Sequence, residues 1–380
     1  MTDPKPSGAA AASRDGPQGG EPLLDGIEAL EVTTPRTAAC LLRRGRVGDG
    51  PVVVLVHGNL SSSRFYEELM RVLPGSWCCL APDMRGYGRS APDPVDATRG
   101  MRAFSDDLAA LLDDPALGLG GGEVHLVGWS LGGGVVMQYA LDHRERVASV
   151  VLLASMSPYG FCGTRDVEGA LCYEDAAGSG AGIVNPALLE KLREGDRGDD
   201  RFAARTVMRT LYYKPPFVPA PDREEVYVTE FLRTAVGDDS YPGTVETSPH
   251  WPGVAPGRRG SANAMSPRYV DLSGFSDVVR ERPVLWVHGA DDAIVSDRSR
   301  SDPGYLGQTG VLPGWPGPEF PPQPMVSQLR AVLERGKDAG GRFEELLLAD
   351  CGHSPHLEHP DTVREALVAF VEKADRRGGR

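Results

Sequence analysis

The chain has 380 residues, of which 41% are hydrophobic and 24% are charged, an ordinary balance for a globular protein with a large core. Its formal net charge of −13 argues against nucleic acid or an anionic membrane surface as a partner. No apolar run reaches the roughly 18 residues that a membrane span needs, and the first residues lack the basic and apolar regions of a signal peptide. We therefore expect a cytoplasmic protein without a membrane span.

The first part of the chain alternates between predicted strands and helices. Residues 1–25 are rich in Ala, Gly, Pro and Ser and predict a disordered tail, because they bury too little apolar surface to offset the entropy of ordering. A short hairpin is expected over 27–32 and 37–43. Residues 51–56 form a continuous apolar run, which is typical of a strand covered on both faces in a parallel sheet. Further strands are expected at 77–82, 124–129, 147–154, 283–288 and 343–348, and helices at 65–72, 101–112, 324–335 and 360–374.

This alternation predicts an α/β fold with a mostly parallel, doubly wound sheet, whose core comprises residues 26–154 and 282–380. Residues 155–281 interrupt it: they show no clear strand and are rich in glycine, proline and aromatic residues. An insertion of this size is normally a cap over the ligand crevice, the alternative being a mere surface excursion. Helices are plausible within it at 186–193, 201–213 and 223–234. A second irregular stretch, 296–323, predicts an extra Pro/Gly-rich loop within the core.

A serine between glycines follows the predicted strand that starts at Val124. The pattern Gly128-x-Ser130-x-Gly132 is that of a nucleophile elbow, a sharp strand-to-helix turn that exposes a reactive hydroxyl. Glycines are needed on both sides because neighbouring side chains would collide in the strained turn. Leu131 then presents its backbone N–H at a helix N-terminus, where a developing negative charge is stabilised.

Acyl transfer by a serine also needs a base and an acid that orients the base. Asp292 and His353 follow later predicted strands, so the chain offers the order Ser130, Asp292, His353. With these residues the sequence resembles the cap-bearing α/β-hydrolase fold family, over roughly residues 27–375. Four segments carry the resemblance, namely the HG loop His57–Asn59, the D-x-R-G-x-G-x-S segment Asp83–Ser90, the elbow Gly128–Gly133 and the G-H-x-x-x-x-E-x-P segment Gly352–Pro360.

The resemblance also implies which acid and which base belong to the triad. The family places its acid three residues after a glycine, which selects Asp292 over its neighbour Asp291. His353 is expected to be the base, whereas His356 and His359 in the next turn are expected to make packing or surface contacts. Cys351 could be a second nucleophile, but the six cysteines show no ligand spacing and are more simply buried small side chains.

The oxyanion donors implied by the resemblance are backbone N–H groups. They are those of Leu131 and, by analogy with the family's loop, of Asn59, with Leu60 as the rival. His57 is expected to support this loop rather than to move protons. Arg85 is expected to be structural, the alternative being a substrate contact.

A serine nucleophile excludes the family's aspartate-based halide and epoxide chemistries. We expect hydrolysis of a carboxylic ester, lactone or thioester with an apolar acyl group, as in the similar esterases, enol-lactonases and cofactor-free haloperoxidase-like members. C–C hydrolysis, acyl transfer or cyclisation in secondary metabolism, with the same triad, is the alternative; a non-catalytic ligand-binding protein is a third. No metal-ligand spacing or phosphate-binding loop is present, so we expect no cofactor and no metal. The oligomeric state stays open.

Overall fold

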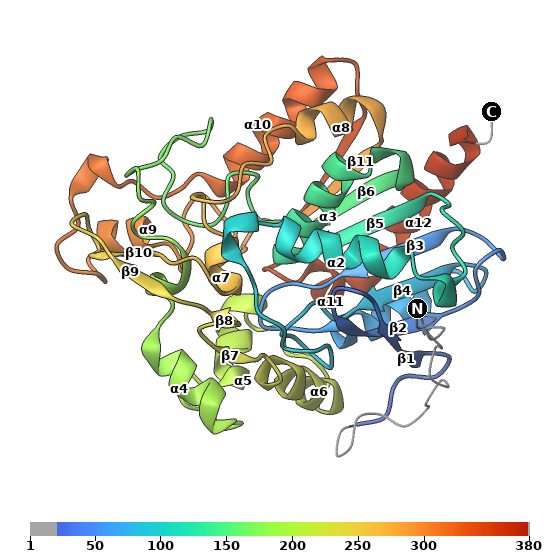
Figure 1. Ribbon diagram of the computed structural model, residues 1–380, viewed down its shortest axis with the longest axis horizontal. Helices are drawn as coiled ribbons and strands as arrows, with labels where there is room; N and C mark the ends of the chain where they lie inside the picture. Colours follow the sequence, from blue (N-terminus) through green and yellow to red (C-terminus); the bar gives the residue numbers. More distant parts are fainter. Residues whose placement is uncertain (1–20, 379–380) are drawn as a thin grey trace, which may run out of the picture.

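A sheet of eight strands, in the order β1-β2-β4-β3-β5-β6-β11-β12, forms the centre of the computed structural model, which describes residues 21–378 (Figure 1). β1 pairs antiparallel with β2, and β2 antiparallel with β4, whereas every neighbouring pair from β4 to β12 is parallel. The mostly parallel sheet predicted from the sequence is therefore confirmed. Its strands are β1 (Glu28–Thr33), β2 (Ala38–Arg44), β3 (Val52–Val56), β4 (Cys78–Pro82), β5 (Val124–Trp129), β6 (Val147–Leu153), β11 (Val284–Gly289) and β12 (Phe343–Leu348).

Helices cover both faces of this sheet, as a doubly wound fold requires. α2, α3, α8 and α10 pack together on one face, and α1, α11 and α12 pack together on the other (Figure 1). The middle strands are buried on both sides; in β3, for example, Val53, Val54 and Leu55 are fully buried. Their continuous apolar pattern reflects this double cover. The core helices are α1 (Glu67–Val72), α2 (Arg102–Leu112), α3 (Leu131–Asp142), α8 (Phe275–Glu281), α10 (Met325–Asp338), α11 (Pro355–Glu358) and α12 (Pro360–Gly378).

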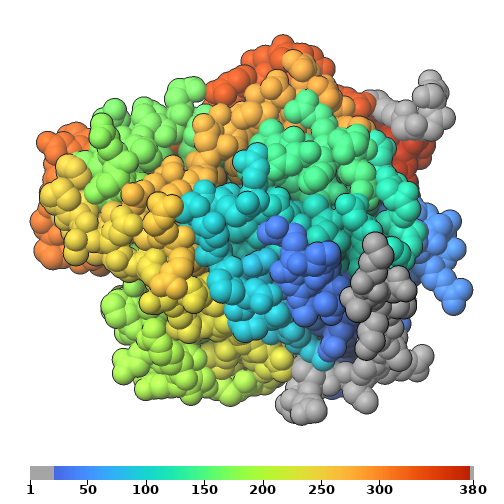
Figure 2. Space-filling view, in the orientation of Figure 1, coloured from blue at the N-terminus to red at the C-terminus, as the bar shows by residue number. Residues whose placement is uncertain are grey.

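Between β6 and α8 the chain forms the insertion predicted as a cap. Figure 1 shows α4, α5 and α6 grouped beside one end of the sheet, and Figure 2 shows this segment packed directly against the core. Its elements are α4 (Pro186–Glu194), α5 (Ala204–Val207), a π-helical turn (Met208–Tyr212), α6 (Pro221–Leu232), α7 (Ser261–Ala264) and the short strands β7 (Val236–Gly237), β8 (Tyr241–Pro242), β9 (Val245–Thr247) and β10 (Val254–Pro256).

Two details of the insertion differ from the sequence-based expectation. The segment contains four strands, although none was expected, because strands of two or three residues are too short to show a period-2 pattern. The helix α8 (Phe275–Glu281) falls inside the range predicted for the cap but packs on α3 and α10 of the core. Its buried side chains Phe275, Val278 and Val279 explain this position, since they continue the apolar layer under the sheet.

The Pro/Gly-rich stretch 296–323 contains the short helix α9 (Pro303–Gln308) and a 3-10 helical turn (Gly317–Glu319). It is anchored by polar groups. The buried Asp302 carboxylate accepts from the backbone N–H groups of Gly304 at 2.9 Å and Gln323 at 2.7 Å. The Gln323 amide in turn donates to the carbonyl of Gly160 and to Gln328 on α10. The stretch is thus joined both to the start of the insertion and to the core.

Most of the predicted disordered tail, 1–25, lies outside the described residues. Its last residues are in contact with the core, contrary to the expectation. The Arg64 guanidinium donates to the carbonyls of Glu21 and Pro22, both at 3.0 Å, and the Leu24 N–H donates to Glu67 at 3.1 Å. These contacts involve backbone groups, which composition alone does not reveal. Within 21–378, no helix combines the length and the apolar composition needed to cross a membrane.

Candidate active site

Ser130 lies at the sharp turn between β5 and α3. Its backbone has φ 56° and ψ −119°, a conformation that non-glycine residues adopt only where the surroundings enforce it. A Cβ on Gly128 would stand 2.4 Å from the carbonyl oxygen of Gly132, and a Cβ on Gly132 would stand 2.1 Å from that of Val56. Both glycines are therefore required for the turn to close. The geometry is that of a nucleophile elbow.

His353 and Asp292 form a buried hydrogen-bonded pair. His353 Nδ1 lies 2.8 Å from Asp292 Oδ2, and both side chains are at most 3% exposed. The other carboxylate oxygen accepts from the N–H groups of Ile294 at 2.8 Å and Val295 at 2.9 Å, which fixes the orientation of the carboxylate. Because an ionised carboxylate can only accept, Nδ1 must carry the proton, which leaves Nε2 free to act as a base.

The two adjacent aspartates diverge. Asp291 is 43% exposed at its side chain and forms an ion pair with Lys214 Nζ at 2.8 Å, whereas Asp292 turns inward to His353. The geometry thus pairs His353 with Asp292.

Trp129, the residue before Ser130, connects the elbow to the loop that carries the base. Its indole Nε1 donates to the carbonyl oxygen of His353 at 2.7 Å, and the two rings lie 5.6 Å apart between centroids. Ser130, which follows β5, and His353, which lies in the loop after β12, are thereby held at the same end of the sheet. Ser130 itself is 8% exposed.

The loop at His57–Asn59 lies against the elbow. A Cβ on Gly58 would stand only 3.0 Å from the Cβ of Ser130. His57 Nε2 accepts from the Met84 N–H at 3.0 Å, so its Nδ1 carries the proton and donates to the Gly58 carbonyl at 2.7 Å. Burial lowers the pKa of His57, which keeps the ring neutral and suited to this role.

The Gly58 carbonyl also accepts from the Ser61 hydroxyl at 2.8 Å. Since N–H and C=O of one peptide point in opposite directions, the Asn59 N–H is directed away from these two partners. Among residues 21–378, neither Asn59 nor Leu131 donates its N–H to a backbone acceptor. Both groups are thus available for an oxyanion. The Tyr87 hydroxyl donates to Asn59 Oδ1 at 2.7 Å and holds the side chain of this residue.

The other candidate groups near His353 have different surroundings. His356 is fully buried between the rings of Trp129 and Tyr66, at 4.9 and 5.0 Å, and burial lowers its pKa to about 3, so it is a neutral packing group. His359 contacts the backbone at the surface. The pKa of the buried Cys351 thiol is raised by burial and by the nearby Glu358, which argues against a second nucleophile.

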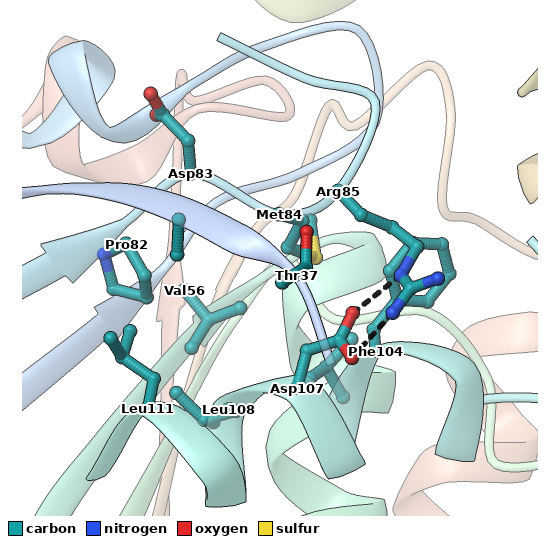
Figure 3. Close-up of a pocket in the computed structure, with 12 residues that line it drawn as sticks. Thr37, Val56, Pro82, Asp83, Met84, Arg85, Phe104, Asp107, Leu108 and Leu111 are labelled. Atoms are coloured by element: carbon teal, nitrogen blue, oxygen red, sulfur yellow. Dashed lines mark hydrogen bonds and ion pairs between the residues drawn. The ribbon is translucent and has the colours of Figure 1, made fainter. Parts of the chain in front are cut away.

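Arg85 forms a bidentate ion pair with Asp107, with N···O distances of 2.5 and 2.6 Å, in agreement with a structural role (Figure 3). The pair lies beside a small pocket under helix α2, where Phe104 and Leu108 form part of the wall (Figure 3). None of the three triad candidates lines this pocket, so it is separate from the candidate active site. In the described part of the chain, no group of three or more His, Cys, Asp or Glu side chains is placed to hold a metal ion.

Sequence reasoning did not find two residues that contact the candidate site. They are Tyr212 and Lys214, which belong to the insertion and contact the loops at Asn59, Asp291 and Asp350. The aromatic content of the insertion was the only signal, and it does not identify individual contacts.

Comparison with known proteins supports the same fold. The family model described as alpha/beta hydrolase fold matches residues 51–166, a range that includes Ser130 but neither Asp292 nor His353. A pimeloyl-(acyl-carrier protein) methyl ester esterase from Neisseria meningitidis is 36% identical over 107 residues. That segment is 28% of this chain and 37% of the relative, so the match spans well under half of either protein.

Solved structures extend the likeness over most of the chain. A bacterial membrane phospholipase A has a TM-score of 0.56 at 18% identity, with 92% of this chain and 87% of that chain covered. The carboxylesterase CesB from Bacillus subtilis has a TM-score of 0.52 at 16% identity, with 91% of each chain covered. At such identities the likeness concerns the fold alone. The matched segment, the strand order and the elbow together show that the chain has the α/β-hydrolase fold.

Proposed function

We propose that this chain is a serine hydrolase that cleaves a carboxylic ester, lactone or thioester through an acyl-enzyme on Ser130. The observation that carries the proposal is the buried 2.8 Å contact between His353 Nδ1 and Asp292, on a fold whose elbow presents Ser130. The esterase name of the Neisseria meningitidis relative supports an ester substrate. The cytoplasmic location predicted from the sequence is part of the proposal.

The reaction follows from the groups already described. The Ser130 hydroxyl attacks the substrate carbonyl carbon while His353 Nε2 takes its proton, and Asp292 stabilises the resulting imidazolium. The N–H groups of Leu131 and Asn59 donate to the oxyanion of the tetrahedral intermediate. The intermediate collapses with loss of the alcohol or thiol, which receives the proton from His353. Water then attacks the acyl-enzyme by the same route and releases the carboxylic acid.

The proposal is tested with the full chain and a series of p-nitrophenyl esters of increasing acyl length. The wild type is expected to hydrolyse at least one ester and to be labelled by a fluorophosphonate on the peptide that contains Ser130. Ser130→Ala is expected to lose both properties. Ser276→Ala, on helix α8 in the core, is the matched control and should retain both. A wild type that is neither active nor labelled, or a Ser130→Ala variant that is still labelled, would contradict the proposal.

A further inference from the structure

Two residues of the insertion, Tyr212 and Lys214, contact the loops of the candidate active site that carry Asn59, Asp291 and Asp350. We call these two residues the cap strap; Tyr212 is the last residue of the π-helical turn Met208–Tyr212. π-Helical turns inside helical segments are frequent at functional sites. The strap is placed close to the loop of the proposed base, because a Cβ on Gly352 would stand 2.7 Å from the backbone nitrogen of Lys214.

Lys214 attaches the strap to the acid and base loops. Its N–H donates to the Glu358 carboxylate at 2.8 Å, and the same carboxylate accepts from the Gly352 N–H at 3.0 Å. Its ammonium group forms ion pairs with Asp291 at 2.8 Å and Asp350 at 2.6 Å. One residue of the insertion therefore bridges the segments on which the proposed acid and base are carried.

Tyr212 attaches the strap to the oxyanion loop. Its hydroxyl donates to the carbonyl oxygen of Asn59 at 2.8 Å and lies 3.4 Å from that of Leu60. The ring is buried and stands edge-on to the rings of Trp129 at 5.7 Å and His353 at 6.0 Å. Burial raises the pKa of Tyr212 well above its ordinary value, so the phenol keeps its proton and remains a donor.

The oxyanion loop needs such support because its backbone is strained. Leu60 has φ 47°, in the left-handed region that residues with a Cβ disfavour. Asn59 is held from two directions, by the Tyr87 hydroxyl at its side chain and by the Tyr212 hydroxyl at its carbonyl. The Tyr87 contact comes from the core and the Tyr212 contact from the insertion. The loop therefore has both contacts only when the insertion is packed against the core.

We infer that Tyr212 is a positioning residue: its hydroxyl holds the Asn59–Leu60 peptide on the C-terminal side of Asn59, and so limits the movement of the residue whose N–H donates to the oxyanion. This inference rests on the proposed hydrolase function and adds to it a role for a residue of the insertion. Positioning matters because the oxyanion donors must already be in place when charge develops on the substrate oxygen. A small displacement of this loop would therefore slow the chemical step more than it would weaken substrate binding.

The test compares Tyr212→Phe with Tyr213→Phe. Both changes remove one phenolic hydroxyl and keep the ring, and the Tyr213 hydroxyl is buried without a hydrogen-bond partner among the described residues. For Tyr212→Phe we expect kcat on the best p-nitrophenyl ester to fall about tenfold with KM nearly unchanged. The affinity for a trifluoromethyl ketone, which forms an oxyanion adduct with serine, should fall by a similar factor. Tyr213→Phe should leave kcat and this affinity unchanged.

The outcomes separate the inference from the function on which it rests. If the wild type is labelled on Ser130 but both Phe variants behave alike, the inference is wrong and the hydrolase proposal stands. If Tyr212→Phe raises KM without lowering kcat, Tyr212 contacts substrate rather than positioning the loop, and the inference is again wrong. If the wild type is neither labelled nor active, the proposed function fails and the inference fails with it.

Discussion

Glu230 on helix α6 is an acidic side chain buried where the insertion meets the core. It is fully buried, and within residues 21–378 its carboxylate oxygens accept no hydrogen bond. Arg233 Nε lies 3.3 Å from Oε1, an ion-pair distance without hydrogen-bond geometry. Burial, followed by the negative charge of Asp83, raises the pKa of Glu230 to about 7, while Arg233 and Arg64 oppose the shift.

The sign and size of the effect on stability follow from this pKa. Because Glu230 titrates near 4.5 when unfolded and near 7 when folded, the folded chain binds more protons between these values. The free energy of unfolding therefore falls as the pH rises through this window. At about 1.4 kcal/mol per pH unit, the window corresponds to about 3 kcal/mol. Glu230→Gln keeps the shape and removes the charge, so the variant should lie within about 1 kcal/mol of the wild type near pH 5 and exceed its stability by up to about 3 kcal/mol at pH 8.

Urea unfolding at pH 5 and pH 8, followed by circular dichroism, measures this difference. Comparing variants at each pH cancels the titration of all other groups. Glu225→Gln on the same helix is the control: Arg197 and Arg205 lower the pKa of Glu225, so neutralising it should give no gain at pH 8. The reasoning is refuted if Glu230→Gln is no more stable than the wild type at pH 8, because the folded state would then accommodate the charge without cost.

Three further predictions concern the candidate site. Asp292→Asn should lower kcat by about 10⁴-fold with the fold intact, because His353 would lose the partner that fixes its tautomer; a loss under tenfold in ester hydrolysis would argue against the triad. Gly128→Ala places a Cβ 2.4 Å from a backbone oxygen and should lower both the thermal midpoint and the activity, whereas Gly237→Ala meets open space and should change neither. Iodoacetamide at pH 8 should not inactivate the enzyme through Cys351, since the thiol is buried with a raised pKa; mass spectrometry of the alkylated peptides would reveal the opposite.

The middle of the sheet was predictable because its strands are covered on both faces. A strand in that position needs apolar residues without alternation, and such runs have visible ends: β5 spans Val124–Trp129, the range expected from the sequence, and β4 begins one residue later than expected. The elbow was predictable for a different reason. Gly128 is imposed by the backbone of Gly132 four residues later, and Gly132 by the backbone of Val56 at the end of the neighbouring strand, so the pattern around Ser130 reflects the geometry directly.

The insertion was predictable only in outline. A single helix was expected over 201–213, but the chain forms α5 and then a π-helical turn that ends at Tyr212. No local periodicity specifies that turn, and the hydroxyl contact of Tyr212 joins residues 153 positions apart. The same holds for Lys214. Its partners Asp291 and Asp350 are distant in sequence, and no motif identifies them as partners of this lysine. Contacts of this kind depend on tertiary packing.

The two proposed oxyanion donors differ in what holds them. The Leu131 N–H belongs to the first turn of α3 and is fixed by the elbow, whose closure depends on core backbone alone. The Asn59 N–H belongs to a loop whose contacts come partly from the insertion, through Tyr212. Displacing the insertion would therefore leave the nucleophile and one donor in place and remove support from the other. A substrate whose binding holds the insertion firmly against the core would stabilise the transition state more than the bound ground state. The insertion can therefore discriminate between substrates through kcat as well as through KM.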